Sequence, residues 1–233
     1  MCSSCSGIGC VHESAGMLEG ACRKIANGPK FSCRVPYVCE PNSQYLDYLV
    51  SRLGPKHAFK DIASWLPPDV LADVNEHIAS SPEPYHHVRD LIMNCKLQAR
   101  APCMIHVYSA CRRPKVDADE TSTVCKDYSI RNLSRKQRNG SFCSVILTWL
   151  KCHIDDQTPV LVHENVEDFD WAIIVEGLEP LGWKNMCSRT LSQLTLARMV
   201  CGELGDLTWR FAQSTESPLS ETSRTQPTCR IDV

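Results

Sequence analysis

Strand-like and helix-like segments alternate along this chain, and that alternation limits its fold more than any other feature. The predicted helices have apolar residues at helical spacing and cover residues 12–25, 42–53 and 142–152. The predicted strands are short apolar runs at residues 34–40 and 159–162, and Lys60–Ile62 is expected to close another. This pattern predicts an α/β fold, with a mostly parallel sheet, helices on both faces, and ligands at the carboxyl ends of the strands.

Glycines and acids stand where the first three strands are expected to end. Gly7 and Gly9 form a turn that lets the backbone approach a ligand closely. Glu40 after the second strand can accept hydrogen bonds from ribose hydroxyls, and Asp61 after the third can accept from an adenine amino group. The set indicates an adenosine cofactor. A nicotinamide enzyme is disfavoured, because a third glycine three residues after Gly9 is missing.

Cys125 and Glu164 lie thirty-nine residues apart, and together they can activate a pyrimidine ring. A thiolate adds to one ring carbon while the acid binds the ring nitrogen and stabilises the resulting charge. Most cysteines in proteins are buried small hydrophobes, and this chain has fifteen. The catalytic interpretation of Cys125 therefore depends on its neighbours and on this spacing.

A short basic run follows Cys125 in the chain. It consists of Arg131, Arg135, Lys136 and Arg138. Such a run is usually a solvated surface, but beside a nucleophile it also predicts a loop that contacts phosphates. The formal net charge of the whole chain is −2, so no global positive field attracts nucleic acid, and any such contact depends on this local patch.

The composition predicts an intracellular globular protein, nuclear or cytoplasmic. A chain of 233 residues with 43% hydrophobic content can bury one core. No apolar run reaches the roughly 18 residues that a membrane helix needs, and the start does not have the pattern of a secretory signal. Fifteen cysteines, an odd number, favour reduced thiols over a disulfide framework. Residues 214–233 are rich in Ser, Thr and Pro, which predicts a disordered tail. The oligomeric state is left open.

Four potential metal ligands lie between residues 95 and 111. They are Cys95, Cys103, His106 and Cys111. Thiolates and imidazoles suit zinc, but the tight Cys-x2-Cys pair of most structural sites is missing, so no metal site is expected. Cys103 follows a proline and is a rival nucleophile. It lies sixty-one residues from Glu164 and lacks the Asp-x-Ser that follows Cys125, so Cys125 is preferred.

Taken together, these motifs resemble those of the C5-cytosine methyltransferases, which methylate cytosine in DNA or, in one branch, in transfer RNA. The matching segments are Cys5–Cys10, Tyr37–Asn42, Lys60–Ile62, Thr123–Ser129, Pro159–Val166 and Leu178–Trp183. The resemblance covers residues 3–66 and 121–198. It predicts a methyltransferase-like domain over residues 1–200 with a divergent insertion at 67–120, followed by a tail at 201–233.

The resemblance implies a Rossmann-like sheet, S-adenosylmethionine as cofactor, and DNA as partner, with RNA as the other candidate. It implies that Cys125 attacks C6 of a flipped cytosine, that Glu164 contacts N3 and the amine, and that Asn165 holds the catalytic loop. The implied cofactor-binding residues are Ser6, Gly7, Gly9, Glu40, Asp61 and Ile62. The implied nucleic-acid-binding residues are Ser129, Arg131, Arg135, Lys136 and Arg138.

Several departures from the family pattern affect the expected activity. Val124 stands where a rigid proline normally precedes the nucleophile. The first strand is clipped, and no target-recognition region or returning terminal motif follows Val200, so the sheet is expected to be incomplete at its ends. Two hypotheses remain: an active cytosine methyltransferase, or a non-catalytic remnant or nucleic-acid-binding module.

Overall fold

The computed structural model describes most of the chain up to Cys201. The described residues are 2–4, 10–24, 32–107, 109–123, 125–129, 131–166, 168–178, 184–191 and 195–201. Ser6, Gly7 and Gly9 of the predicted glycine turn lie outside these residues, as do Val124 and residues 202–233 of the predicted tail. No helix within the described ranges is both long and apolar enough to cross a membrane.

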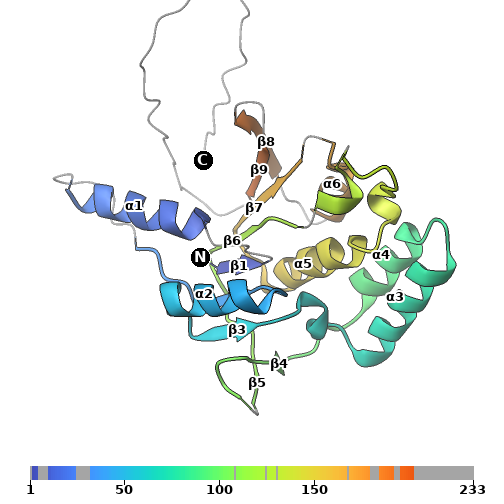
Figure 1. Ribbon diagram of the computed structural model, residues 1–233, viewed down its shortest axis with the longest axis horizontal. Coiled ribbons are helices and arrows are strands. Elements are labelled where there is room, and N and C mark those ends of the chain that lie inside the picture. The colour runs from blue at the N-terminus through green and yellow to red at the C-terminus, as the bar shows by residue number, and fades with distance from the viewer. Residues whose placement is uncertain are drawn as a thin grey trace, which may run out of the picture.

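The centre of the molecule is a seven-stranded sheet with the order β3-β2-β1-β6-β7-β9-β8 (Figure 1). The strands are β1 (Cys2–Ser4), β2 (Tyr37–Cys39), β3 (His57–Phe59), β6 (Ala118–Thr121), β7 (Val160–Asn165), β8 (Lys184–Leu191) and β9 (Thr195–Cys201). The first five of these pair in parallel, whereas β9 runs antiparallel to both β7 and β8. The predicted fold class, a Rossmann-like α/β sheet, is confirmed.

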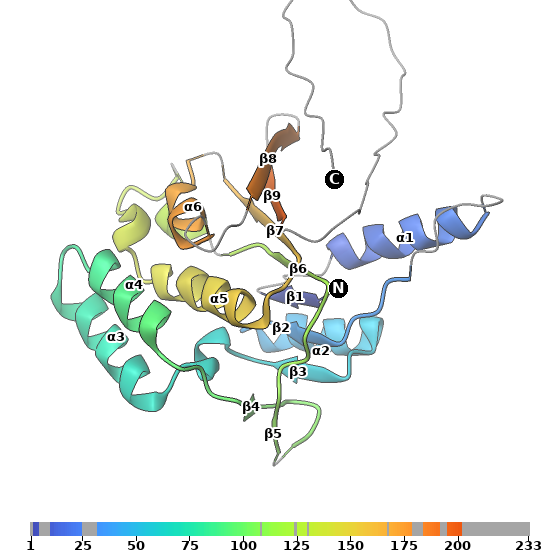
Figure 2. The same cartoon turned by 180° about the vertical axis from the view of Figure 1, so that it is seen from behind.

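Helices cover both faces of the sheet. They are α1 (Cys10–Lys24), α2 (Ser43–Leu53), α3 (Pro68–Ser80), α4 (Tyr85–Asn94), α5 (Cys143–Asp156) and α6 (Ala172–Leu178). The side chains of β2 alternate between two cores, because Tyr37 and Cys39 join the larger core with α5 while Val38 packs with Leu46 and Leu49 of α2. Figure 2 shows α3, α4 and α5 side by side, away from α1 and α2.

The predicted helices over 12–25, 42–53 and 142–152 correspond to α1, α2 and α5. The third strand ends at Phe59, before the predicted Lys60–Ile62. The chain turns there because Asp61 Oδ1 accepts the backbone N–H of Ala63 at 2.8 Å and begins the 3₁₀ helix η1 (Ile62–Trp65). A side-chain hydrogen bond thus competes with extension of the strand.

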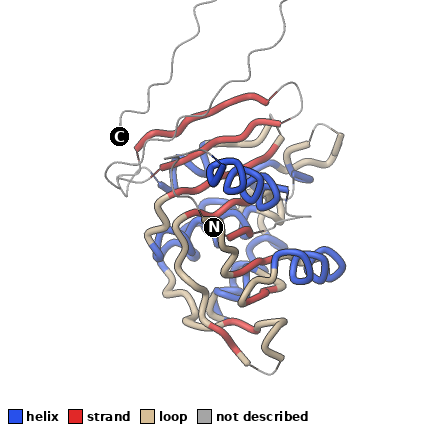
Figure 3. Tube along the Cα trace, turned by 90° about the vertical axis from the view of Figure 1, so that its left-hand side faces the viewer, coloured by secondary structure: helices blue, strands red, loops and turns tan. Residues whose placement is uncertain are grey.

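The segment at residues 67–120, predicted as an insertion, is well packed and ends inside the sheet. Val74 of α3 and Val88 and Ile92 of α4 are buried in the larger core, and residues 118–120 belong to β6. Between them lies a small ribbon of β4 (Ala101–Pro102) and β5 (Ala110–Cys111). Figure 3 shows this ribbon at the end of the molecule opposite the β8–β9 hairpin.

A buried polar contact fixes β6, the strand that leads to Cys125, against α5. The Trp149 indole N–H donates to Asp119 Oδ2, and His153 Nε2 lies 2.7 Å from the same oxygen. Asp119 is fully buried, and a buried carboxylate without partners would cost several kcal/mol. The position of β6 relative to α5 is therefore tightly specified.

Candidate active site

The predicted functional residues gather at one edge of the sheet. Since β2, β3, β6 and β7 are parallel, their carboxyl ends lie on the same side. Glu40 follows β2, Asp61 lies just beyond β3, and Glu164 is the penultimate residue of β7. Cys125 begins the 3₁₀ helix η2 (Cys125–Asp127) after β6. The thiol of Cys125 itself lies outside the part of the chain that the structure describes.

Asn165 connects the end of β7 to the loop that leads to Cys125. Its Nδ2 donates to the backbone oxygen and to Oγ1 of Thr123, both at 3.0 Å, while its Oδ1 accepts the N–H of Val166 at 2.9 Å. Asn165 and Thr123 are both buried. Thr123 lies two residues before Cys125, the predicted nucleophile. These bonds therefore fix the loop at residues 122–127, here called the nucleophile loop, against the end of β7 that bears Glu164.

His163 is a buried neighbour of this network that the sequence did not single out. Its Nε2 lies 3.0 Å from Thr123 Oγ1, and the rings of Trp171 and Phe169 pack around it. Burial lowers the pKa of His163 to about 3, so the imidazole is neutral near pH 7. Because Thr123 Oγ1 already accepts from Asn165, its own proton can go to Nε2.

Asp127 anchors the other end of the nucleophile loop. Its Oδ2 accepts the backbone N–H of Phe142, immediately before α5, at 3.2 Å. Gly140 lies against this carboxylate so closely that a Cβ there would be 1.9 Å from Oδ2. The sequence showed Asp127 as a motif residue, but its contact with α5 could not be read from spacing.

Glu164 points away from the larger core, to which α5 contributes. Along β7, Leu161, His163 and Asn165 are buried, while Val162 and Glu164 on the opposite face are partly exposed. Leu161 belongs to the larger core, so Glu164 lies on the face of the sheet that carries α2. A carboxylate there is accessible to a ligand at the sheet edge.

The two acidic candidates for cofactor binding are held by backbone amides. Glu40 is buried, and its Oε1 accepts the N–H of Asn42, the N-cap residue of α2, at 2.9 Å. Asp61 is exposed, with Oδ1 capping η1. Ile62, predicted to contact the cofactor, is 5% exposed and packs in the larger core.

Two arginines of the basic run form ion pairs within the protein. Arg135 donates to Asp168 Oδ2 at 2.8 Å and Arg138 donates to Asp170 Oδ2 at 2.6 Å. These acids follow β7, and sequence spacing gave no sign of the pairing. Arg131 and Lys136 are exposed, and the Ser129 hydroxyl accepts the backbone N–H of Arg131 at 3.3 Å. The surface that can meet phosphates is therefore smaller than the sequence predicted.

Cys103, the rival nucleophile, lies far from this edge. Burial raises the pKa of its thiol, but hydrogen bonds with the backbone of Ala58 and with the backbone and ring of His106 outweigh that effect and lower the pKa to about 6. Cys103 lies beside β3, whereas Glu164 lies on β7, with three strands between. At about 4.8 Å per strand this is roughly 19 Å, too far for one pyrimidine ring to reach both groups.

Comparison with known proteins gives no family assignment. No protein-family model and no curated protein matches the sequence. Similar solved structures include a mutant DNMT2 of Spodoptera frugiperda, with a TM-score of 0.43 and 14% identity over 92% of this chain and 52% of that chain. Another is DhpI in a complex with SAM and HEP, with a TM-score of 0.29 and 12% identity over 86% of this chain and 61% of that chain.

This chain spans about half the length of the DNMT2 chain, which is covered over 52%. The class that the strand order defines is a Rossmann-like α/β protein, with acidic residues at the carboxyl ends of its parallel strands.

Proposed function

We propose that this protein transfers a methyl group from S-adenosylmethionine to C5 of cytosine in DNA through a covalent adduct with Cys125. The observation that supports the proposal best is the pair of hydrogen bonds from Asn165 to Thr123. They join the strand end that bears Glu164 to the loop that leads to Cys125. A thiol and a carboxylate brought to one edge are what activation of a pyrimidine requires.

In the proposed reaction, the Cys125 thiolate forms a bond to C6 of the cytosine and breaks the C5–C6 double bond. Glu164 binds N3 and the exocyclic amine, and so stabilises the charge that moves into the ring. S-adenosylmethionine, when bound, supplies the methyl group that C5 accepts. A base then removes the C5 proton, the double bond re-forms, and the thiolate of Cys125 leaves C6.

The acids at the ends of β2 and β3 fit the polar groups of an adenosine. Glu40 would accept from the ribose hydroxyls and Asp61 from the adenine amine, since both are carboxylates at neighbouring strand ends. Their anchoring by the N–H groups of Asn42 and Ala63 gives them fixed orientations. Ser6, Gly7 and Gly9 complete the proposed set.

The target base must leave its helix to reach Cys125, because the attacked carbon is inaccessible within the base stack. Arg131 and Lys136 are exposed beside the nucleophile loop and would contact the phosphates of the DNA. Ser129 is the third member of this proposed contact surface.

A second candidate is a non-catalytic remnant that retains the fold, or a nucleic-acid-binding module. The ion pairs of Arg135 with Asp168 and of Arg138 with Asp170 favour the remnant, because they reduce the positive charge that could bind phosphates beside Cys125. A transfer RNA methyltransferase is the third candidate, since the residues at the sheet edge do not distinguish the two nucleic acids.

Calorimetry of the full chain with S-adenosylmethionine tests the proposed cofactor. We expect saturable binding that weakens by about tenfold in Glu40→Gln, a change of about 1.4 kcal/mol. Glu76→Gln, an exposed acid on α3, is the matched control and should bind like the original protein. Absence of binding heat would favour the non-catalytic candidate. Transfer of labelled methyl groups to DNA or to transfer RNA then separates the remaining two.

A further inference from the structure

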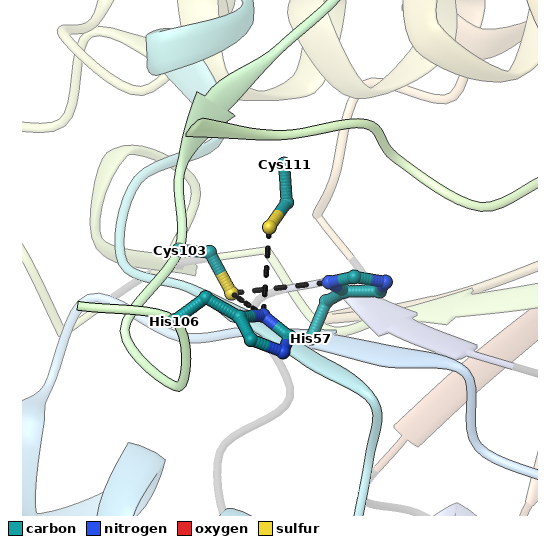
Figure 4. A group of neighbouring side chains, drawn as sticks. All are labelled: His57, Cys103, His106 and Cys111. Carbon is teal, nitrogen blue, oxygen red and sulfur yellow. Dashed lines mark hydrogen bonds between the residues drawn. The ribbon is translucent and has the colours of Figure 1, made fainter. Parts of the chain in front are cut away.

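Two thiols and two imidazoles converge beside β3, away from the candidate active site (Figure 4). They belong to His57, Cys103, His106 and Cys111, and one potential ligand atom from each lies within 4.8 Å of all the others. His106 Nδ1 is 3.4 Å from each of the two sulfur atoms, and Cys103 Sγ is 3.9 Å from His57 Nδ1.

These separations match the edges of a tetrahedral zinc site. With zinc–sulfur bonds of about 2.3 Å and zinc–nitrogen bonds of about 2.0 Å, a sulfur and a nitrogen ligand are about 3.6 Å apart. The three sulfur–nitrogen distances lie within a few tenths of an ångström of this value. Small side-chain rotations would therefore suffice to place all four atoms around one ion.

We propose that His57, Cys103, His106 and Cys111 bind a structural zinc ion. Two cysteines and two histidines form one of the ligand sets typical of structural zinc, and four protein ligands leave no open position for catalysis. Two thiolates balance the charge of the ion, so the loaded site is neutral overall. Tetrahedral coordination by two sulfur and two nitrogen atoms also favours zinc over magnesium or calcium.

Backbone hydrogen bonds organise the segment that carries the cluster. Within the β4–β5 ribbon, the N–H of Cys103 donates to Ser109 at 3.3 Å, and the N–H of Ser109 donates to His106 at 2.8 Å. The N–H of Met104 donates to the backbone oxygen of Ala58 in β3 at 2.8 Å. These bonds hold Cys103 and His106 close together and place them against the strand that begins with His57, while Cys111 pairs with Ala101 in the ribbon.

The ligand set corrects the one considered from the sequence. Cys95 lies at the end of α4, where its thiol donates to the oxygen of Ile92 at 3.2 Å, and it is not part of the cluster. His57 takes its place, forty-six residues before Cys103. The ion would clamp the ribbon to β3, the outermost strand on its side of the sheet, and so protect that edge.

Metal content and cobalt spectroscopy of the full chain with reduced thiols test the proposal. We expect one zinc ion per chain. When cobalt(II) replaces zinc, the protein should show the visible absorption of a tetrahedral site with thiolate ligands. Cys111→Ser and His57→Ala should weaken binding by more than the 10–100-fold that loss of a supporting hydrogen bond costs. Cys95→Ser is the matched control and should retain full binding.

His57→Cys keeps the test decisive if an alanine variant fails to fold. Three cysteines and one histidine also bind zinc, so this variant should hold one ion with an altered cobalt spectrum. The proposal is overturned if the reduced original chain binds no metal, or if the chain purified without reductant contains a Cys103–Cys111 disulfide and no zinc. Unchanged affinity in His57→Ala, or equal loss in Cys95→Ser, would overturn the assignment of ligands.

Discussion

The candidate active site and the proposed zinc site both combine cysteine with histidine, yet their side chains are held in place in different ways. The proposed zinc site consists of His57, Cys103, His106 and Cys111. At the active-site edge, Thr123, His163 and Asn165 are 4%, 1% and 2% exposed and bond to one another inside the core. In the cluster, His106 is exposed, and His57 and Cys111 are partly exposed. The first arrangement is fixed by packing, whereas the second depends on a short ribbon at the edge of the sheet.

The difference indicates what each arrangement needs. A buried network of hydrogen bonds stays ordered because opening it would leave more polar groups without partners in an apolar core. Exposed side chains gain little from each other and lose rotamer freedom on being ordered. A bound ion can supply the missing free energy, since metal binding and local folding are coupled. Substitutions in the two regions should therefore change the stability and activity of the protein differently.

The largest expected effect is on the anchor of the nucleophile loop. Gly140→Val places a side chain on the Asp127 carboxylate, displaces it from the Phe142 N–H, and should lower the free energy of unfolding by about 3 kcal/mol. Gly20→Ala, on α1 with open space around it, is the control and should stabilise by about 0.5–1 kcal/mol. Denaturant unfolding measures both, and equal effects would mean that the loop is not fixed by packing.

The buried histidine should make stability depend on pH. The pKa of His163 is about 3 in the folded protein, below the ordinary value of 6.5, so acid favours the unfolded chain, which takes up the proton. Stability is retained above pH 6.5 and is lost as the pH falls, by about 2 kcal/mol between pH 6.5 and pH 5. In His163→Phe this part of the slope should vanish. An identical slope in both proteins would show that His163 is solvated.

Removal of the link between Asn165 and Thr123 should affect both stability and reaction. Asn165→Ala leaves buried acceptors without a donor, and a loss of about 1–2 kcal/mol is expected. The rate of adduct formation with a cytosine analogue should fall by more than the loss of folded protein explains, because the nucleophile loop is displaced. Cys111→Ser, in the distant cluster, should leave the adduct rate unchanged. Similar slowing in both variants would contradict the separation of the two regions.

The smallest effect is expected for the basic run. Arg131→Ala should weaken DNA binding and reduce the slope of log affinity against log salt by about 1. Arg138→Ala should change this slope less, because Arg138 is paired with Asp170 and lies over the ring of Tyr85. Titration of binding at several salt concentrations measures both. A larger slope change for Arg138 would mean that its ion pair opens on DNA.

The features that depend on residues close together in the chain could be predicted from the sequence. The helix over 42–53 and the strand over 34–40 follow from apolar spacing, and the structure has them as α2 and β2 with slightly shorter bounds. The placement of Glu40, Asp61 and Glu164 at one edge follows from the parallel order of their strands. These predictions needed only residues close together in the chain.

The contacts that were missed join residues far apart in sequence. His57 was overlooked as a ligand because it lies forty-six residues from Cys103, and the pairing of Arg138 with Asp170 spans thirty-two. The helices α3 and α4 were not predicted, although Val88 and Ile92 follow helical spacing, because the segment was interpreted as an insertion without family motifs. Long-range partners depend on how helices pack on the sheet, which periodicity does not report.

The central claim is that Cys125 is the nucleophile of a cytosine methyltransferase. The most direct measurement is covalent capture of the full chain by DNA containing 5-fluorocytosine, with S-adenosylmethionine present, read by intact mass. We predict an adduct with the original protein and with Cys103→Ser, and none with Cys125→Ser. An adduct that persists in Cys125→Ser, or that is lost only in Cys103→Ser, would contradict the claim.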